Sequence, residues 1–228
     1  MVNKITRRAL LATGLVSAVA YGRGIFQMED LHSRLFPELV GRWGELNLDS
    51  ESRNVSEIDF TDPNEFEKWL KQVHEQKNVN YSYGGFLEDR SNIWRNHYMK
   101  DSGDFIHLGV DYNVPAGTSV HLVCDGELVH KMKDTRWGGW GGRLLWKLKD
   151  SPFYLAVGHL TDMREASYAG QIAGRVANPN ENGYWYPHVH VQLMDRQFVE
   201  SFSDLDEIDG YIGRNNPNLG YIRNPAIL

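Results

Sequence analysis

The chain has very little cysteine. Cys124 is its single cysteine in 228 residues, so no intramolecular disulfide can form. It stands in an apolar run, where a small buried hydrophobe is a simpler role than a nucleophile. Basic residues are not in excess either, because 24 Lys and Arg face 30 Asp and Glu, a formal net charge of −6. Since nucleic-acid binders carry a basic surface, we expect no nucleic-acid partner.

Long hydrophobic runs are absent as well. A modest apolar stretch follows Ala9, and at about 12 residues it is too short to span a bilayer. We therefore expect no transmembrane span. Lys4, Arg7 and Arg8 precede this stretch, and Ala18–Ala20 resembles a cleavage site, which together is the layout of an export signal. The motif "TRRALL" also loosely resembles a twin-arginine signal.

These features divide the chain into three parts. Residues 1–20 are predicted to be a signal peptide, which places the protein in the periplasm or outside the cell. The alternative is an amphipathic N-terminal helix or an uncleaved anchor, and the protein is expected in the cytoplasm if these residues are not a signal. Residues 21–79 are predicted to be a helical accessory region, in which Asp62 and Pro63 have the types expected at a helix start. Residues 80–228 form the third part.

The sequence pattern of the third part, residues 80–228, is typical of a β domain. Short apolar runs such as "FIHLGVDYNV", "GRLLWKLK" and "HVHVQLM" are bounded by Gly, Pro, Asn or Asp, as strands are. No helical pattern of similar strength separates them. The predicted fold class is therefore mainly β (α+β), with an antiparallel sheet that forms a groove and an N-terminal helical region.

Several strand-like runs place polar residues on one face. Successive side chains of a strand point to opposite faces, so His188 and His190 in "PHVHVQL" share a face. His107 and Asp111 in "FIHLGVDYNV" do so too, while "FYLAVGHL" contains His159. Each pair alone is equally typical of solvated strand residues. A catalytic zinc takes three His, Asp or Glu ligands, and hydrolysis needs further groups nearby, so the combination indicates a metallohydrolase.

The order and surroundings of these residues resemble the M23 family of zinc metallopeptidases, the lysostaphin-type and LytM-type peptidoglycan endopeptidases. "YGGFLEDR" is similar to the family's Phe-Gly-x-Arg segment, and "HLGVDYNVPAGTSV" to its His-x-Gly-x-Asp signature. "AGQIAGRVANPNENGYWYPHVHVQL" is similar to the Gly-x-x-Ile-Gly turn that leads to Pro-His-Leu-His-Phe-Glu. The resemblance covers about residues 81–195.

The resemblance implies a zinc site and a substrate. His107, Asp111 and His190 correspond to the ligands of Zn²⁺, and His159 and His188 to the two catalytic histidines. The implied substrates are peptide bonds in the stem or cross-bridge peptides of peptidoglycan.

A substrate groove is a further expectation. Arg90 matches the arginine of the Phe-Gly-x-Arg segment, and Trp140 and Trp185 are candidates for the groove walls. A structural salt bridge and ordinary core packing explain these three residues equally well.

The chain departs from the M23 pattern at several positions. "AVGHL" replaces Tyr-x-His-Leu, Val191-Gln192 replaces Phe-Glu, and Gly142-Arg143 stands where Gly-Asn is common. The tail after residue 195 lies beyond the family motifs and receives no chemistry. Two alternatives stay open: a zinc peptidase that acts on a non-wall protein, and a non-catalytic wall-binding regulator of other hydrolases.

Overall fold

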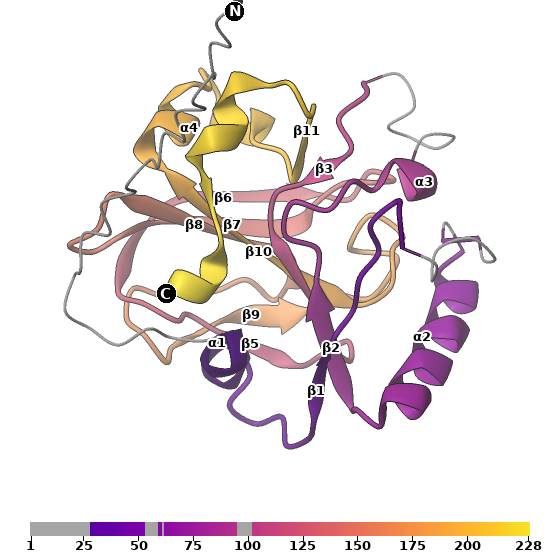
Figure 1. Ribbon diagram of the computed structural model, residues 1–228. Coiled ribbons are helices and arrows are strands. Elements are labelled where there is room, and N and C mark those ends of the chain that lie inside the picture. Colours follow the sequence, from indigo (N-terminus) through magenta and orange to yellow (C-terminus); the bar gives the residue numbers. More distant parts are fainter. Residues whose placement is uncertain (1–27, 53–58, 61, 95–101) are drawn as a thin grey trace, which may run out of the picture.

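A computed structural model describes residues 28–52, 59–60, 62–94 and 102–228 of the chain (Figure 1). The predicted signal peptide, residues 1–20, lies outside the described residues. Within the described ranges, none of the helices has the length and apolar character needed to cross a membrane.

The described chain is mainly β, as the sequence predicts. The helices are α1 (Met28–Leu35), α2 (Pro63–Lys77), α3 (Ser91–Trp94) and α4 (Arg196–Glu200), with short 3-10 turns at Leu205–Glu207, Pro217–Tyr221 and Pro225–Ile227. The strands are β1 (Trp43–Glu45), β2 (Tyr81–Gly84), β3 (Ile106–His107), β4 (Val110–Asn113), β5 (Ser119–His121), β6 (Gly126–Asp134), β7 (Gly141–Leu148), β8 (Phe153–Thr161), β9 (Ile172–Val176), β10 (His188–Asp195), β11 (Tyr211–Ile212) and β12 (Ile222–Arg223).

One large sheet organises the molecule, in the order β1-β2-β4-β10-β8-β7-β6. Its pairings are antiparallel except that β1 joins β2 in parallel at the edge. In Figure 1, α2 lies along the β1–β2 edge, and the yellow C-terminal segment brings β11 next to β3. The sheet therefore places β4 and β10 at its centre, where the two halves of the predicted site meet.

The stretch expected as one strand, residues 105–114, divides at Leu108 and Gly109 into β3 and β4. Gly109 lies so close to the His190 ring and the Val191 carbonyl that a side chain at this position would collide with both. Only glycine lets the backbone pass at this distance. The break at Gly109 thus lets the chain that carries His107 pass close to the His190 ring.

The apolar alternation of these strands forms the core, as predicted. Val189, Val191 and Leu193 of β10 and Val110 and Tyr112 of β4 are fully buried in the main cluster of apolar side chains. Their neighbours along each strand point to the opposite face of the sheet. Burial of the apolar face therefore fixes the register that brings the polar residues together.

The accessory region is built into the sheet. Leu31 and Leu35 of α1 are buried in the main core, and residues 43–45 add strand β1 where the sequence predicts a helical region. Helix α2 begins as predicted at Asp62, whose side chain accepts a hydrogen bond from the Asn64 amide at 2.8 Å. This region is continuous with the β domain in its packing.

The sequence context of His74, on helix α2, suggests a solvated residue. In the structure His74 is instead half-buried and hydrogen-bonded. Its Nε2 lies 2.8 Å from Ser82 Oγ on β2, and Asn113 Nδ2 of β4 donates to the same oxygen at 3.1 Å. Burial lowers the pKa of His74 from its usual value. Helix α2 therefore contacts the polar face of the sheet through a hydrogen-bonded histidine.

We expect this contact to make stability depend on pH. Because the unfolded chain binds the His74 proton more readily than the folded protein, the free energy of unfolding falls as the pH drops through about 6.5. The variant His74→Gln, which keeps a hydrogen-bonding group, should lose less stability than the parent between pH 7.5 and 5.5. Urea unfolding at both pH values measures this, and equal losses would show that His74 is not involved.

Candidate active site

Three side chains that the sequence selected meet at the centre of the sheet. In the antiparallel pairing of β4 with β10, Asp111 lies directly opposite His190, and β3 supplies His107. His107 Nε2 lies 2.9 Å from His190 Nδ1 and 3.3 Å from Asp111 Oδ1, which is 3.1 Å from His190 Nδ1. All three residues are buried. Together they form a compact triangle of ligand atoms.

The hydrogen bonds around the triangle determine which nitrogen of each imidazole carries the proton. His107 Nδ1 lies 2.9 Å from the Gly85 carbonyl, which can only accept, so this nitrogen carries the proton and Nε2 has a lone pair. Gly85 has φ +106, and a side chain there would collide with the His107 ring. The carbonyl can approach this closely because residue 85 is glycine.

Gln192 fixes the position of the proton on the second imidazole, that of His190. Gln192 Nε2 donates to the Asp209 carbonyl at 3.3 Å, which leaves its Oε1 to accept from His190 Nε2 at 3.0 Å. His190 Nδ1 therefore has a lone pair that points into the triangle. Two imidazole lone pairs and a carboxylate oxygen converge, and they repel one another unless a cation lies between them.

This donor set fits a zinc ion. Ligand atoms about 2.0–2.1 Å from a tetrahedral zinc lie roughly 3.3 Å apart, close to the separations of the triangle. A proton would lie between two of the three atoms, whereas a metal ion at the centre contacts all of them. Each ligand is oriented by a neighbour outside the triangle, as is usual for zinc-binding histidines and carboxylates.

Arg90 holds the carboxylate of Asp111. Its Nη1 donates to Asp111 Oδ2 at 2.6 Å, which leaves Oδ1 for the triangle, and its Nε and Nη2 donate to Glu88 at 3.2 Å. Burial opposes ionisation of Asp111, but His107 and Arg90 outweigh it and hold its pKa well below the usual range. Burial and the Arg90 charge lower the pKa of His107 to about 3. At neutral pH the site therefore contains the Asp111 carboxylate and a neutral His107.

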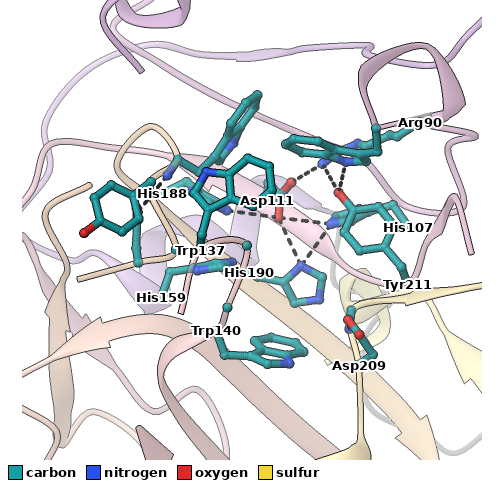
Figure 2. Close-up of a pocket in the computed structure, with 18 residues that line it drawn as sticks. Arg90, His107, Asp111, Trp137, Trp140, His159, His188, His190, Asp209 and Tyr211 are labelled. Atoms are coloured by element: carbon teal, nitrogen blue, oxygen red, sulfur yellow. Dashed lines mark hydrogen bonds and ion pairs between the residues drawn. The ribbon is translucent and has the colours of Figure 1, made fainter. Parts of the chain in front are cut away.

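The other two histidines lie on the opposite side of Asp111 from Arg90 (Figure 2). His188 Nδ1 donates to the Tyr186 carbonyl at 2.6 Å, and its Nε2 lies 3.9 Å from Asp111 Oδ1. The His159 ring lies 4.2 Å from the His188 ring, and its buried Nδ1 has no hydrogen-bond partner among the residues that the structure describes. Burial is the main reason that the pKa values of both histidines fall below the usual value. Two neutral imidazoles thus flank the triangle.

His159 has a backbone conformation that is uncommon for residues other than glycine. Its φ is +62°, in the left-handed region. Its amide donates to the Trp140 carbonyl at 2.9 Å, and its carbonyl accepts from Ala177 at 3.0 Å. Non-glycine residues in this region cost about 1–3 kcal/mol and cluster at functional sites. The Trp140 ring stacks on the imidazole with centroids 5.9 Å apart.

A cleft with about 630 Å³ of empty space opens above these residues. The cleft is lined by two groups of residues: Trp137–Trp140 with Asn182–Trp185, and Arg90 and Trp94 with Asp209–Tyr211. The candidate groove residues Arg90, Trp140 and Trp185 all line it, although the hydrogen bonds of Arg90 go to neighbouring residues of the protein. Among the described residues of 28–79, none lines this cleft.

The C-terminal tail supplies residues that the sequence does not reveal. Tyr211 Oη accepts from Arg90 Nη1 at 3.3 Å and from Trp94 Nε1 at 2.9 Å, and its ring lies 5.1 Å from the His107 ring. The Gly210 carbonyl accepts from the Leu108 amide at 2.8 Å. The tail lies outside the family motifs, and its position depends on the pairing of β11 with β3. No sequence motif in the tail indicates that Tyr211 and Gly210 contribute to the site.

The chain is similar to solved structures of M23 peptidases. Neither a family model nor a curated protein matches it. Similar solved structures include a mutant catalytic domain of EnpA, a prophage-encoded M23 protein from Enterococcus faecalis (22% identity, TM-score 0.36, 49% of this chain and 78% of that chain). The catalytic domain of the antimicrobial peptidase lysostaphin from Staphylococcus simulans is also similar (27%, 0.36, 42% and 73%), as is LytU (18%, 0.37, 53% and 70%).

The M23 resemblance that the sequence indicates thus reappears among solved structures. With TM-scores below 0.5, these neighbours do not define the chemistry of this chain, which depends on the site itself.

The role of Gln192 can be tested by zinc affinity. Gln192→Leu keeps the size of the side chain but removes the acceptor for His190 Nε2, so we expect zinc affinity to fall about 10–100-fold. Gln192→Glu restores an acceptor and should bind zinc at least as tightly as the parent. Competition with a chromophoric chelator measures both variants, and unchanged affinity in Gln192→Leu would disprove this positioning role.

Proposed function

We propose that this protein is an exported zinc metalloendopeptidase of the M23 type, which hydrolyses peptide bonds in the stem or cross-bridge peptides of peptidoglycan. The observation that carries the proposal is the convergence of three lone-pair atoms at the floor of a cleft, beside two neutral histidines. The peptidoglycan assignment is supported by the motif resemblance, and export by the signal layout of residues 1–20.

In this proposal His107, Asp111 and His190 would hold Zn²⁺. When bound, the ion would supply a Lewis acid that polarises the scissile carbonyl and activates a water molecule. Arg90 keeps Asp111 ionised, and the Gly85 and Gln192 contacts keep both histidines in the tautomers that metal binding requires. The chain therefore fixes the ligand atoms before any substrate arrives.

The two remaining histidines would move protons and bind developing charge. His188 donates Nδ1–H to the Tyr186 carbonyl, so its Nε2 has a lone pair, 3.9 Å from Asp111, that can accept a proton from the attacking water. His159, neutral and held against Trp140, can donate a hydrogen bond to the carbonyl oxygen as it becomes negative.

The alternatives differ in what they require of the site. A non-catalytic regulator has no need for a complete ligand triangle, and the chain retains all three ligands and both flanking histidines. A peptidase that acts on a non-wall protein would use the same site, so the nature of the substrate must be decided by experiment.

Two variants separate zinc binding from catalysis. We expect His190→Ala to lose bound zinc, because it removes one of three ligands, and His188→Ala to keep zinc but lose most turnover, on the order of 10²–10⁴-fold. Elemental analysis of the purified variants and a hydrolysis assay measure the two effects. Equal zinc contents in both variants would contradict the assignment of ligand and base.

The proposal as a whole is tested by a digest. The zinc-loaded full chain is incubated with purified cross-linked peptidoglycan, with and without a chelator, and the released fragments are identified by mass spectrometry. New chelator-sensitive termini at a stem or bridge bond are the expected result. Absence of cleavage with zinc bound contradicts a wall substrate, and absence of both zinc and cleavage favours the regulator.

A further inference from the structure

Among the described residues, three that carry a formal charge line the cleft: Arg90, Asp111 and Asp209. The first two bind each other, because Arg90 Nη1 donates to Asp111 Oδ2 at 2.6 Å. The remaining hydrogen bonds of Arg90 go to Glu88 and Tyr211. Asp209 is therefore a charged group of the cleft that the proposed reaction does not use.

Asp209 has no ion-pair partner in the part of the chain that the structure describes. Arg136 and Arg143 are near enough for their charges to act on it, but both are bound elsewhere. Arg136 donates to Asp134 at 2.8 and 2.9 Å, and Arg143 donates to two backbone carbonyls. The negative charge of Asp209 is thus not paired with a cation of the protein.

Backbone contacts orient the Asp209 carboxylate. Its Oδ1 accepts from the Gly210 amide at 2.6 Å, and a hydrogen bond from the Tyr211 amide also stabilises its charged form. The Asp209 carbonyl accepts from Gln192 Nε2 at 3.3 Å. A carboxylate has about four acceptor positions, so two N–H donors leave some of them free. The group is therefore held in place with acceptor capacity to spare.

The carboxylate of Asp209 is accessible and incompletely hydrated. Asp209 is an exposed residue that lines the cleft, and Figure 2 shows it beside the His190 ring. Enough protein nevertheless surrounds the carboxyl group that its partial removal from water raises the pKa of Asp209 above the usual value. An anion with reduced hydration and without a counter-ion is stabilised by a cation that enters the cleft.

One imidazole ring separates this carboxylate from the ligand triangle. Gly210 packs against that ring, since a side chain at this position would lie 3.3 Å from His190 Cε1. His190 Nδ1 faces the triangle. The distance from a bond that reacts at the triangle to Asp209 is therefore about one to three residues of extended peptide, at roughly 3.3–3.6 Å per residue.

We propose that Asp209 determines substrate specificity by binding an ammonium group of the peptide, about one to three residues from the scissile bond. An ammonium group carries three donors and a positive charge, and its hydrogen bonds to a carboxylate are charge-assisted. The group is a free amino terminus or the side-chain amine of a diamino acid. The inference rests on the proposed peptidase function and narrows its substrates to peptides with such a cation near the bond.

Peptides that differ only in charge test the proposal. Synthetic stem-type peptides are made with every amine free, with only the α-amine free, with only the side-chain amine free, and with every amine acetylated. We expect kcat/KM to be at least about 10-fold higher for the fully free peptide than for the fully acetylated one. The two peptides with a single free amine identify which amine binds. Equal kcat/KM values for all four overturn the proposal.

The variant Asp209→Asn removes the charge but keeps an acceptor for the Gly210 amide. We expect it to retain zinc and to lose the preference for free amines, to less than about 2-fold. A preference that persists has another origin, such as coordination of the amine to zinc, and overturns the proposal. An equal loss of kcat/KM on all four peptides shows that the charge acts on the site rather than on the substrate, and it overturns the proposal too.

The variant Asp206→Asn is the matched control. It removes the same charge from the same segment, but Asp206 lies 3.2 Å from His130 and does not line the cleft. The preference for free amines should be the same as in the parent. Its loss in Asp206→Asn would show that the overall charge of the segment selects the substrate, and would overturn the role of Asp209.

Binding of the same four peptides separates this inference from the proposed function. Their Kd values are measured by isothermal titration calorimetry with the zinc-loaded full chain and with Asp209→Asn. If no peptide is hydrolysed, the proposed function fails, and tighter binding of free amines that depends on Asp209 still supports the ammonium site. Equal Kd values for free and acetylated peptides, or no binding at all, overturn it.

Discussion

The structure depends on the convergence of three hydrogen-bond acceptors in a buried place. His107 Nε2, His190 Nδ1 and Asp111 Oδ1 lie 2.9–3.3 Å apart, and the proton of each imidazole is directed outward. Without a cation this arrangement is repulsive, so the surrounding fold must hold it in place. Gly109 allows β3 to approach the His190 ring, and the apolar face of β10 fixes the register. Core packing thus provides the free energy that holds together a group of side chains that could bind a metal ion.

Buried charge imposes the second constraint. Asp111 is ionised in a place with almost no solvent, and it stays so because His107 and Arg90 hold its pKa well below the usual range. Arg90 also donates to Glu88, which extends the hydrogen-bonded network. Removal of one partner from a buried ion pair costs about 3–5 kcal/mol, since it leaves the other charge uncompensated. Arg90 also binds Tyr211, which comes from the far end of the chain. The network therefore links the His107–Asp111–His190 triangle to the C-terminal tail as well as to the sheet.

Much of this could be predicted from residue spacing. Even separations and flanking aliphatic residues place His107, Asp111, His188 and His190 on one face, and β4 and β10 do pair with that face in common. The spacing could not show which strands would be neighbours, since pairing depends on contacts between distant parts of the chain. His74 has the sequence context of a surface residue, yet its partner Ser82 becomes available only once α2 packs on β2. The parallel edge strand β1 has the same origin in tertiary packing.

The departures from the M23 pattern become intelligible when they are considered with the tail. Gln192 donates to the Asp209 carbonyl, and Arg143, fully buried, donates to the carbonyls of Leu205 and Ile208. Both residues therefore hold the segment that precedes Tyr211. A carboxylate at position 192 could not donate to the Asp209 carbonyl, and an asparagine at position 143 is too short to reach both carbonyls from its strand. The two substitutions and the tail are thus coupled, because Gln192 Nε2 and the Arg143 guanidinium donate to carbonyl groups that the tail supplies.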